Sequence, residues 1–142
     1  MIIDGSRAAD RTSALILRYV AARNRGDIDS MLDCLSDDVA HDVNNGTRET
    51  GKPAFRAYLQ KMLGHYREEI RDIVVMSVDD GTRAAAEFSV HGVYQTDDAG
   101  LPPAHGQRYT LQGGAFFAIN QGKIVRVTHY RNQRDFSAQV SA

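Results

Sequence analysis

Helical and strand-like patterns occupy separate parts of this 142-residue chain. Up to about Gly64, apolar side chains recur at the three- and four-residue spacing of helices. From Glu69 onward, the chain forms strand-like runs that end at turn residues. Helices followed by consecutive strands indicate an α+β fold with a mostly antiparallel sheet, rather than an alternating α/β fold.

The first half predicts two consecutive helices joined by a tight break. The first helix spans about residues 6–25, and Gly26 is expected just past its end because glycine tolerates the left-handed conformation. Asp27 is well suited to cap a short second helix that ends before residues 36–38. One face of the first helix carries Leu15, Ile16, Tyr19, Val20, Ala22 and Arg23.

A third helix is expected after an extended segment. Residues 39–45 look extended, and Asn45-Gly46 is a turn signal. Pro53 then lies in the first turn of the third helix, where its missing N–H costs nothing. That helix carries Phe55, Tyr58, Leu59, Met62 and Leu63.

Four strand-like runs follow, over residues 69–78, 83–95, 107–119 and 123–133. Asp80-Gly81 is a strong hairpin signal between the first two runs. Residues 96–106 form a loop with two consecutive prolines. Alternation in the second run places six residues on one face: Ala84, Ala86, Phe88, Val90, Gly92 and Tyr94.

Composition excludes several classes of function. The net charge of −1 gives no electrostatic basis for binding nucleic acid or a membrane surface. The single cysteine, Cys34, fits a buried thiol in a reduced cytoplasmic protein. The five histidines lack the paired spacing of a metal site. The length suits one domain over residues 1–142, with no signal or membrane segment expected.

The segment from Arg18 to Asp29 resembles the opening of ketosteroid isomerases and their SnoaL-like relatives, in the nuclear transport factor 2-like superfamily. The resemblance extends over about residues 14–132 and is also strong at residues 35–38. It implies a conical barrel, in which a strongly curved, mostly antiparallel sheet is wrapped by three helices (the cystatin-like fold). It also implies a homodimer, an apolar pocket in each subunit and no cofactor.

The resemblance assigns candidate catalytic residues near the start of the chain. Tyr19 matches the tyrosine that donates a hydrogen bond to a developing enolate, although it could also be a core aromatic residue. The general base of these isomerases is an aspartate, and Asp42 is the nearest candidate. Counting from residues 37–38 places the base on Val43, whereas counting back from Gly51 places it on Asp42. If Asp42 faces outward, His41 faces inward and is the alternative base.

The second oxyanion donor of these isomerases, a protonated aspartate, falls on Gly114, which has no side-chain donor. The last strand offers replacements, because Val127, His129 and Arg131 alternate onto one face. His129 is a candidate proton donor or base, and Arg131 is a candidate ligand for a carboxylate, phosphate or enolate. The alternative is that both are paired with acids at the mouth of the cone or at a dimer contact.

The remaining expected pocket residues are apolar wall: Tyr58, Leu59, Phe88, Val90, Gly92 and Phe116. Three functions stay open at this stage. The first is a cofactor-free acid/base enzyme, of isomerase or polyketide cyclase type, acting through an enolate on a small apolar substrate with a carbonyl or anionic group. The second is a non-catalytic module that binds a small molecule. The third is a dimerisation domain whose cavity is filled and whose Arg131 is paired within the protein.

Overall fold

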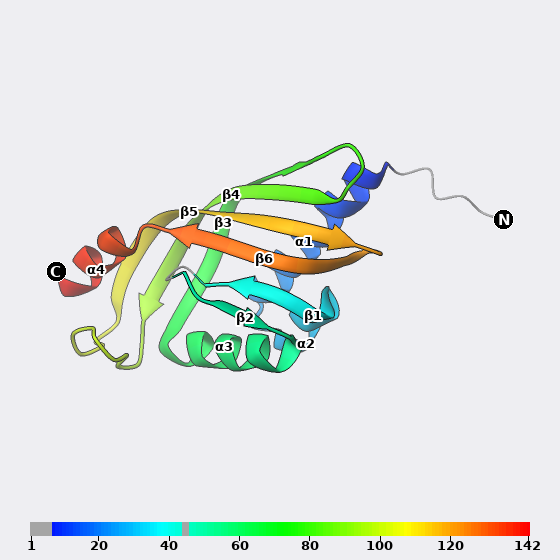
Figure 1. Ribbon diagram of the computed structural model, residues 1–142. Coiled ribbons are helices and arrows are strands. Elements are labelled where there is room, and N and C mark those ends of the chain that lie inside the picture. The colour runs from blue at the N-terminus through cyan, green and yellow to red at the C-terminus, as the bar shows by residue number, and fades with distance from the viewer. Residues whose placement is uncertain (1–6, 44–45) are drawn as a thin grey trace.

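The computed structural model describes residues 7–43 and 46–142. It has the expected mixed α+β architecture, with six strands in one sheet in the order β2-β1-β6-β5-β4-β3. Neighbouring strands are antiparallel except β1 and β6, which are parallel. In Figure 1, α3 runs along one side of the curved sheet, and α4 lies at the opposite end of the molecule from the start of α1.

The first two helices are close to their predicted positions. Helix α1 spans Ala8–Asn24 and α2 spans Ile28–Asp33. Gly26 has a φ of 68°, as expected of a residue just past a helix end. The Asp27 carboxylate caps α2 by accepting a hydrogen bond from the backbone N–H of Ser30. The face of α1 predicted to be apolar is buried and packs against β3.

Strand β1 spans Leu35–Asp42 and begins four residues earlier than the extended segment predicted from sequence. The predicted turn includes Asn45, which lies outside the described residues. A short strand that was not predicted, β2 (Arg48–Thr50), pairs with β1. Helix α3 then spans Lys52–His65, with Pro53 in its first turn as expected.

The rest of the sheet comprises β3 (Tyr66–Ser77), β4 (Arg83–Tyr94), β5 (Gln107–Asn120) and β6 (Lys123–Arg131). Strand β3 begins three residues before the predicted run, and this places Glu68 within it. A bulge between Arg71 and Val74 includes Asp72 with a φ of 55°. Such bulges bend and twist a sheet, which is what curving it around a core requires.

A fourth helix, α4 (Gln133–Ser141), corrects the prediction of three helices. The Asn132 side chain caps it by accepting from the backbone N–H of Asp135. Phe136 and Val140, four residues apart, bury their side chains toward β5. Asn132 and the spacing of Phe136 and Val140 are signals of this helix. The predicted last strand, over residues 123–133, includes Asn132 and so hides the cap.

Candidate active site

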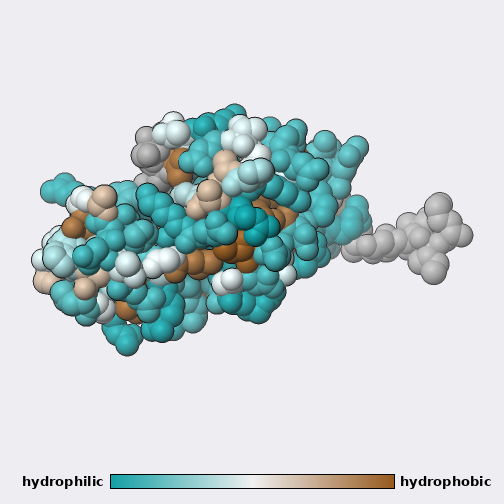
Figure 2. All heavy atoms as spheres, turned by 90° about the horizontal axis from the view of Figure 1, so that it is seen from below, coloured by the Kyte–Doolittle hydropathy of each residue, from teal (hydrophilic) through white to brown (hydrophobic). Residues whose placement is uncertain are grey.

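A pocket lies between the concave face of the sheet and helices α1 and α3. Its volume is about 100 Å³, several times what one water molecule needs. The lining comprises Tyr19, Val20, Arg23, Met31, His41, Phe55, Tyr58, Leu59, Met62, Leu63, Tyr66, Glu68, Ile70, Phe88, Val90, Ala115, Phe117, Val127, His129, Tyr130 and Arg131. Leu63 is 39% exposed, so the lining reaches the surface. Figure 2 shows exposed hydrophobic residues between hydrophilic ones near the middle of one face.

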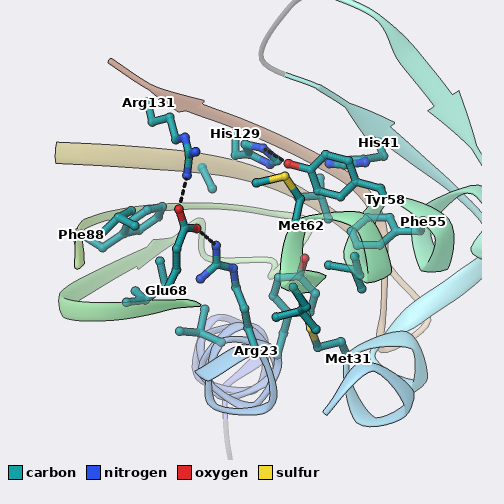
Figure 3. Close-up of a pocket in the computed structure, with 18 of the residues that line it drawn as sticks. Arg23, Met31, His41, Phe55, Tyr58, Met62, Glu68, Phe88, His129 and Arg131 are labelled. Carbon is teal, nitrogen blue, oxygen red and sulfur yellow. Dashed lines mark hydrogen bonds and ion pairs between the residues drawn. The ribbon is translucent and has the colours of Figure 1, made fainter. Parts of the chain in front are cut away.

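One side of the pocket is formed by His41, Tyr58 and His129, which we call the histidine wall (Figure 3). The His41 and His129 ring centres lie 5.2 Å apart, and the Tyr58 ring lies edge-on to His41 at 4.6 Å. The Tyr58 hydroxyl is 3.3 Å from Nε2 of His129, within hydrogen-bonding distance. The histidine wall therefore brings together side chains from three elements: His41 from β1, Tyr58 from α3 and His129 from β6.

Burial keeps both imidazoles of the histidine wall neutral. It lowers the pKa of His41 to about 4 and the pKa of His129 to about 4. For His129 the positive charges of Arg23 and Arg131 act in the same direction. A neutral imidazole has an unprotonated ring nitrogen, so each histidine can accept a proton near pH 7.

His41 has an unusual environment for a buried polar residue. Its side chain is 1% exposed and lies 4.4 Å from the Phe55 ring, centre to centre. Neither ring nitrogen has a hydrogen-bond partner among the described residues. Buried polar groups are normally hydrogen-bonded, so an unpartnered imidazole beside a pocket is available to a ligand or an ordered water.

The opposite side of the pocket holds an ion cluster centred on Glu68, which we call the arginine cluster (Figure 3). The Glu68 carboxylate accepts hydrogen bonds from Arg23 Nη2 and Arg131 Nη1, each at 2.7 Å. It also accepts one from the Tyr109 hydroxyl. Burial alone would raise the pKa of Glu68, but these partners outweigh it and lower the pKa to about 2. Glu68 is therefore ionised, with a side chain only 5% exposed.

Burying a charge without a partner is costly, and Arg131 has such a partner in Glu68. Besides Glu68, its guanidinium stacks over the Phe136 ring of α4 at 5.0 Å. The charge of Arg131 is consequently held in place by β3 and by the helix that the sequence did not predict.

Tyr19 lies in the pocket lining with its side chain on the α1 face, as predicted. It is 7% exposed, and burial raises the pKa of its hydroxyl, which therefore stays protonated. The Tyr19 hydroxyl has no hydrogen-bond partner among the described residues. It is a donor that a bound molecule can use.

The prediction that Asp42 reaches into the pocket is wrong. Its carboxylate points to the other face of β1 and accepts bonds from Arg48 Nε at 2.5 Å and Nη2 at 3.0 Å. The Thr128 hydroxyl donates to it at 2.6 Å. These hydrogen bonds hold the pKa of Asp42 far below its usual range. Because strand side chains alternate, His41 is the residue of this pair that faces the pocket.

Two expected wall residues, Phe116 and Gly92, and the predicted pocket position Gly114 are also misplaced. Phe116 is 48% exposed on the outer face of β5, and Gly114 shares that face. The inward positions are Gly113, Ala115 and Phe117, so β5 still offers no side-chain donor. Gly92 lies beneath the Tyr109 ring, where an added Cβ would meet a ring carbon at 2.1 Å, and it is outside the pocket lining.

The other predicted wall residues, Tyr58, Leu59, Phe88, Val90 and Val127, do line the pocket. Sequence reasoning missed Glu68 and did not assign Arg23 a role in the site. The available signal was periodicity: Arg23 lies four residues after Tyr19 on the same helical face. Glu68 lies between Tyr66 and Ile70, which are both buried on the inward face of β3.

An outer cleft of about 760 Å³ adjoins the pocket. The two share five lining residues: Tyr58, Met62, Tyr66, His129 and Arg131. The far side of the cleft is formed by Leu101, Gln133 and Phe136. His129 and Arg131 therefore lie where a small inner chamber meets a larger outer one.

Within residues 7–43 and 46–142, no group of three or more potential ligands could hold a metal ion. No helix in the same ranges is long and apolar enough to cross a membrane.

The sequence model of the SnoaL-like domain family matches residues 16–127. The chain belongs to this family. Its α+β fold is that of the nuclear transport factor 2-like superfamily, as the resemblance implied. A comparison with curated proteins finds no match.

Two similar solved structures are described as candidate polyketide cyclases. The one from Xanthomonas campestris pv. campestris is 53% identical, covers 94% of this chain and 98% of its own, and has a TM-score of 0.92. The one from Pseudomonas putida is 52% identical, covers 96% and 99%, and has a TM-score of 0.88. An LEH-like epoxide hydrolase from M. tuberculosis is 16% identical, covers 94% and 91%, and has a TM-score of 0.70, which shows a shared fold alone.

Proposed function

We propose that this SnoaL-like protein is a cofactor-free acid/base enzyme that forms an enolate from a small carbonyl substrate, in a reaction of polyketide cyclase type. The observation that carries the proposal is the neutral imidazole of His129, which contacts the Tyr58 hydroxyl in a largely apolar pocket. Histidine is the side chain that most often serves as a general base, and a neutral imidazole has an unprotonated ring nitrogen that can take a proton.

His129 is the proposed base. It takes a proton from the carbon next to the carbonyl, and the electron pair of that C–H bond moves into the enolate. The hydroxyl of Tyr19 donates a hydrogen bond to the enolate oxygen, where negative charge develops. In a cyclisation, the enolate carbon attacks a second carbonyl of the same molecule, and the proton on His129 returns to the new alkoxide.

The ionised groups of the pocket do not compete for this role. Glu68 is a poor base because its pKa is lowered to about 2, and Asp42 lies on the other face of the sheet. The arginine cluster instead supplies positive charge near the reacting carbonyl. It contributes to the field at His129 and at both Tyr19 and Tyr58.

A binding module is the second candidate function. The observation that favours it is the inward face of β5, where Gly113, Ala115 and Phe117 provide no second side-chain donor for an enolate. A scaffold with a filled cavity predicts that Arg131 is paired within the protein, and it is. It is nevertheless less well supported, because the pocket is open rather than filled. The homodimer and the cytoplasmic location stay predictions.

Enolate formation can be tested without knowing the product. In D₂O, an enzyme that forms enolates exchanges the α-protons of ketones for deuterium, which ¹H NMR detects. We expect exchange with at least one member of a panel of small methyl ketones and 1,3-diketones. His129→Gln should slow it by about 10²–10⁴-fold, and Tyr19→Phe by about 10²–10³-fold.

The matched control is His105→Gln, because His105 is an exposed loop histidine away from the pocket. It should exchange at the wild-type rate. Exchange that persists in His129→Gln would refute the assigned base. Ligand binding by the wild type with no exchange across the panel would favour the binding module.

A further inference from the structure

The arginine cluster leaves the pocket with an excess of positive charge. Two cations, Arg23 and Arg131, face one anion, Glu68. The two histidines that line the pocket are neutral at pH 7, because burial lowers the pKa of each to about 4, and burial raises the pKa of the tyrosine hydroxyls beside them. These groups are Tyr19 from α1, His41 from β1, Tyr58 from α3, Tyr66 from β3, Tyr109 from β5 and His129 from β6. In the adjoining outer cleft, the Asp98 carboxylate accepts from the Tyr66 hydroxyl, and Glu49 and Lys61 carry opposite charges.

A buried excess charge is costly unless a counter-charge accompanies it. Among the described residues lining the pocket, the single carboxylate is already shared between the two arginines. A ligand with one negative charge would bring the sum of charges in the pocket to zero. A phosphate monoester, with about two negative charges, would overcompensate.

Arg23 is positioned to bind such a ligand. It uses Nη2 to bond Glu68, and its Nε and Nη1 have no hydrogen-bond partner among the described residues. Its side chain lines the pocket and is 26% exposed. A guanidinium donates charge-assisted hydrogen bonds to a carboxylate from any N–H group that has no other partner, and Arg23 has such groups at Nε and Nη1.

We propose that the substrate is a keto acid whose single carboxylate binds Arg23 while its carbonyl lies between Tyr19 and His129. This rests on the proposed function, because it places the reacting carbonyl at the acid/base groups. The inner chamber of about 100 Å³ holds the keto acid portion, and any longer chain extends into the outer cleft past Met62.

The bound carboxylate has a consequence for the base. Burial has the largest effect on His129 and lowers its pKa; His41, Arg23 and Arg131 lower it further, whereas Glu68 raises it. A second negative charge in the same pocket would raise the pKa of His129, as Glu68 does. Binding of an anionic substrate therefore raises the pKa of His129 toward neutrality, which makes it a stronger base once the substrate is in place.

The test compares 4-oxopentanoate with its uncharged isostere 4-oxopentanamide by titration monitored with protein NMR at low salt. We expect the wild type to bind the acid at least about tenfold more tightly, which corresponds to one charge-assisted contact. In the same titrations, the pKa of His129 should rise with the acid and not with the amide. This comparison needs no variant, so it tests the proposal even if a substitution disturbs the fold.

Arg23→Gln should remove the preference for the acid, while Arg23→Lys should keep part of it. The control is Arg56→Gln, which removes an exposed arginine paired with Asp29 outside the pocket and should leave the preference intact. Equal binding of acid and amide, binding of neither, or a preference that survives in Arg23→Gln would overturn the proposal. Exchange of neutral ketones without a preference for the acid would support the proposed enolate-forming function and refute the keto acid substrate. An acid preference without exchange would indicate an anion-binding module.

Discussion

The two sides of the pocket hold their polar groups in opposite ways (Figure 3). In the arginine cluster every ionised group has a charged partner, and Glu68 accepts bonds from three side chains. On the histidine wall there is one long hydrogen bond, between Tyr58 and His129, and His41 has none among the described residues. Saturated partners fix charge and position, whereas unpartnered neutral groups stay available for chemistry.

This difference has an energetic counterpart. Removing one member of a buried ion cluster leaves the others desolvated and unpaired, so each member stabilises the fold once the cluster exists. A buried polar group without a partner has the opposite effect, because folding removes its bonds to water and returns nothing. Substitutions on the two sides should therefore change stability with opposite signs.

The largest effect is expected for Glu68→Ala, which leaves Arg23 and Arg131 facing each other without a counter-charge. We expect the free energy of unfolding to fall by about 3–5 kcal/mol, the usual cost of breaking a buried ion pair. Urea denaturation monitored by circular dichroism measures it. A loss below about 1 kcal/mol would mean that solvent reaches the cluster and would weaken the contrast between the two sides.

The neighbouring residue on β3 provides the control. Glu69 pairs with Arg71 at 2.7 Å, the same distance as in the cluster, but both side chains are about half exposed. Exposed pairs contribute about 0–1 kcal/mol, so Glu69→Ala should be close to neutral. The two variants thus compare one interaction distance at two degrees of burial.

An effect of similar order is expected from pH, and it should come from the histidine wall. The pKa of each histidine is about 4 in the folded protein and about 6.5 in the unfolded chain. Between these values the unfolded chain binds more protons, so stability is complete above about pH 6.5 and is lost as pH falls toward 4. The slope is at most about 1.4 kcal/mol per pH unit for each histidine.

The contribution of Glu68 lies in a lower window, because its pKa falls from 4.5 to about 2 on folding. Its stabilisation is lost only as pH falls through that range. Urea denaturation at several pH values from 7 to 5 therefore isolates the histidines. A free energy of unfolding that stays constant over this range would show that the imidazoles remain accessible to protons in the folded state.

The fold could be largely predicted from sequence because its signals are local. Helical periodicity, the cap at Asp27 and the hairpin at Asp80-Gly81 each act within a few residues, and all three agree with the structure. The parallel pairing of β1 with β6 joins residues about ninety positions apart, and nothing local marks it. Helix α4 was missed for a different reason, because Asn132 was assigned to the preceding strand.

The site was predicted only where its register was clear. On β6 the alternation of Val127, His129 and Arg131 onto one face was correct, and all three line the pocket. On β1 and β5 the positions came from counting against a resemblance, and a shift of one residue turned Asp42 and Phe116 to the outer face. The partnership of Arg23 with Glu68 spans 45 positions, so periodicity could place each on an inward face but could not pair them.

The smallest expected effect is at His41, and it has the opposite sign from that at Glu68. His41→Leu replaces a buried imidazole, unpartnered among the described residues, with an apolar side chain next to Phe55 and Tyr58. We expect the free energy of unfolding at pH 7 to rise by about 1 kcal/mol, since the penalty for an unsatisfied group is removed. The variant should also show a shallower loss of stability between pH 6.5 and 4, because one of the two titrating histidines is gone.

His105→Gln, at an exposed position, should change neither quantity. If His41→Leu were instead destabilising by 1 kcal/mol or more, ordered water would be bonding the His41 nitrogens in solution, and both sides of the pocket would then be partnered.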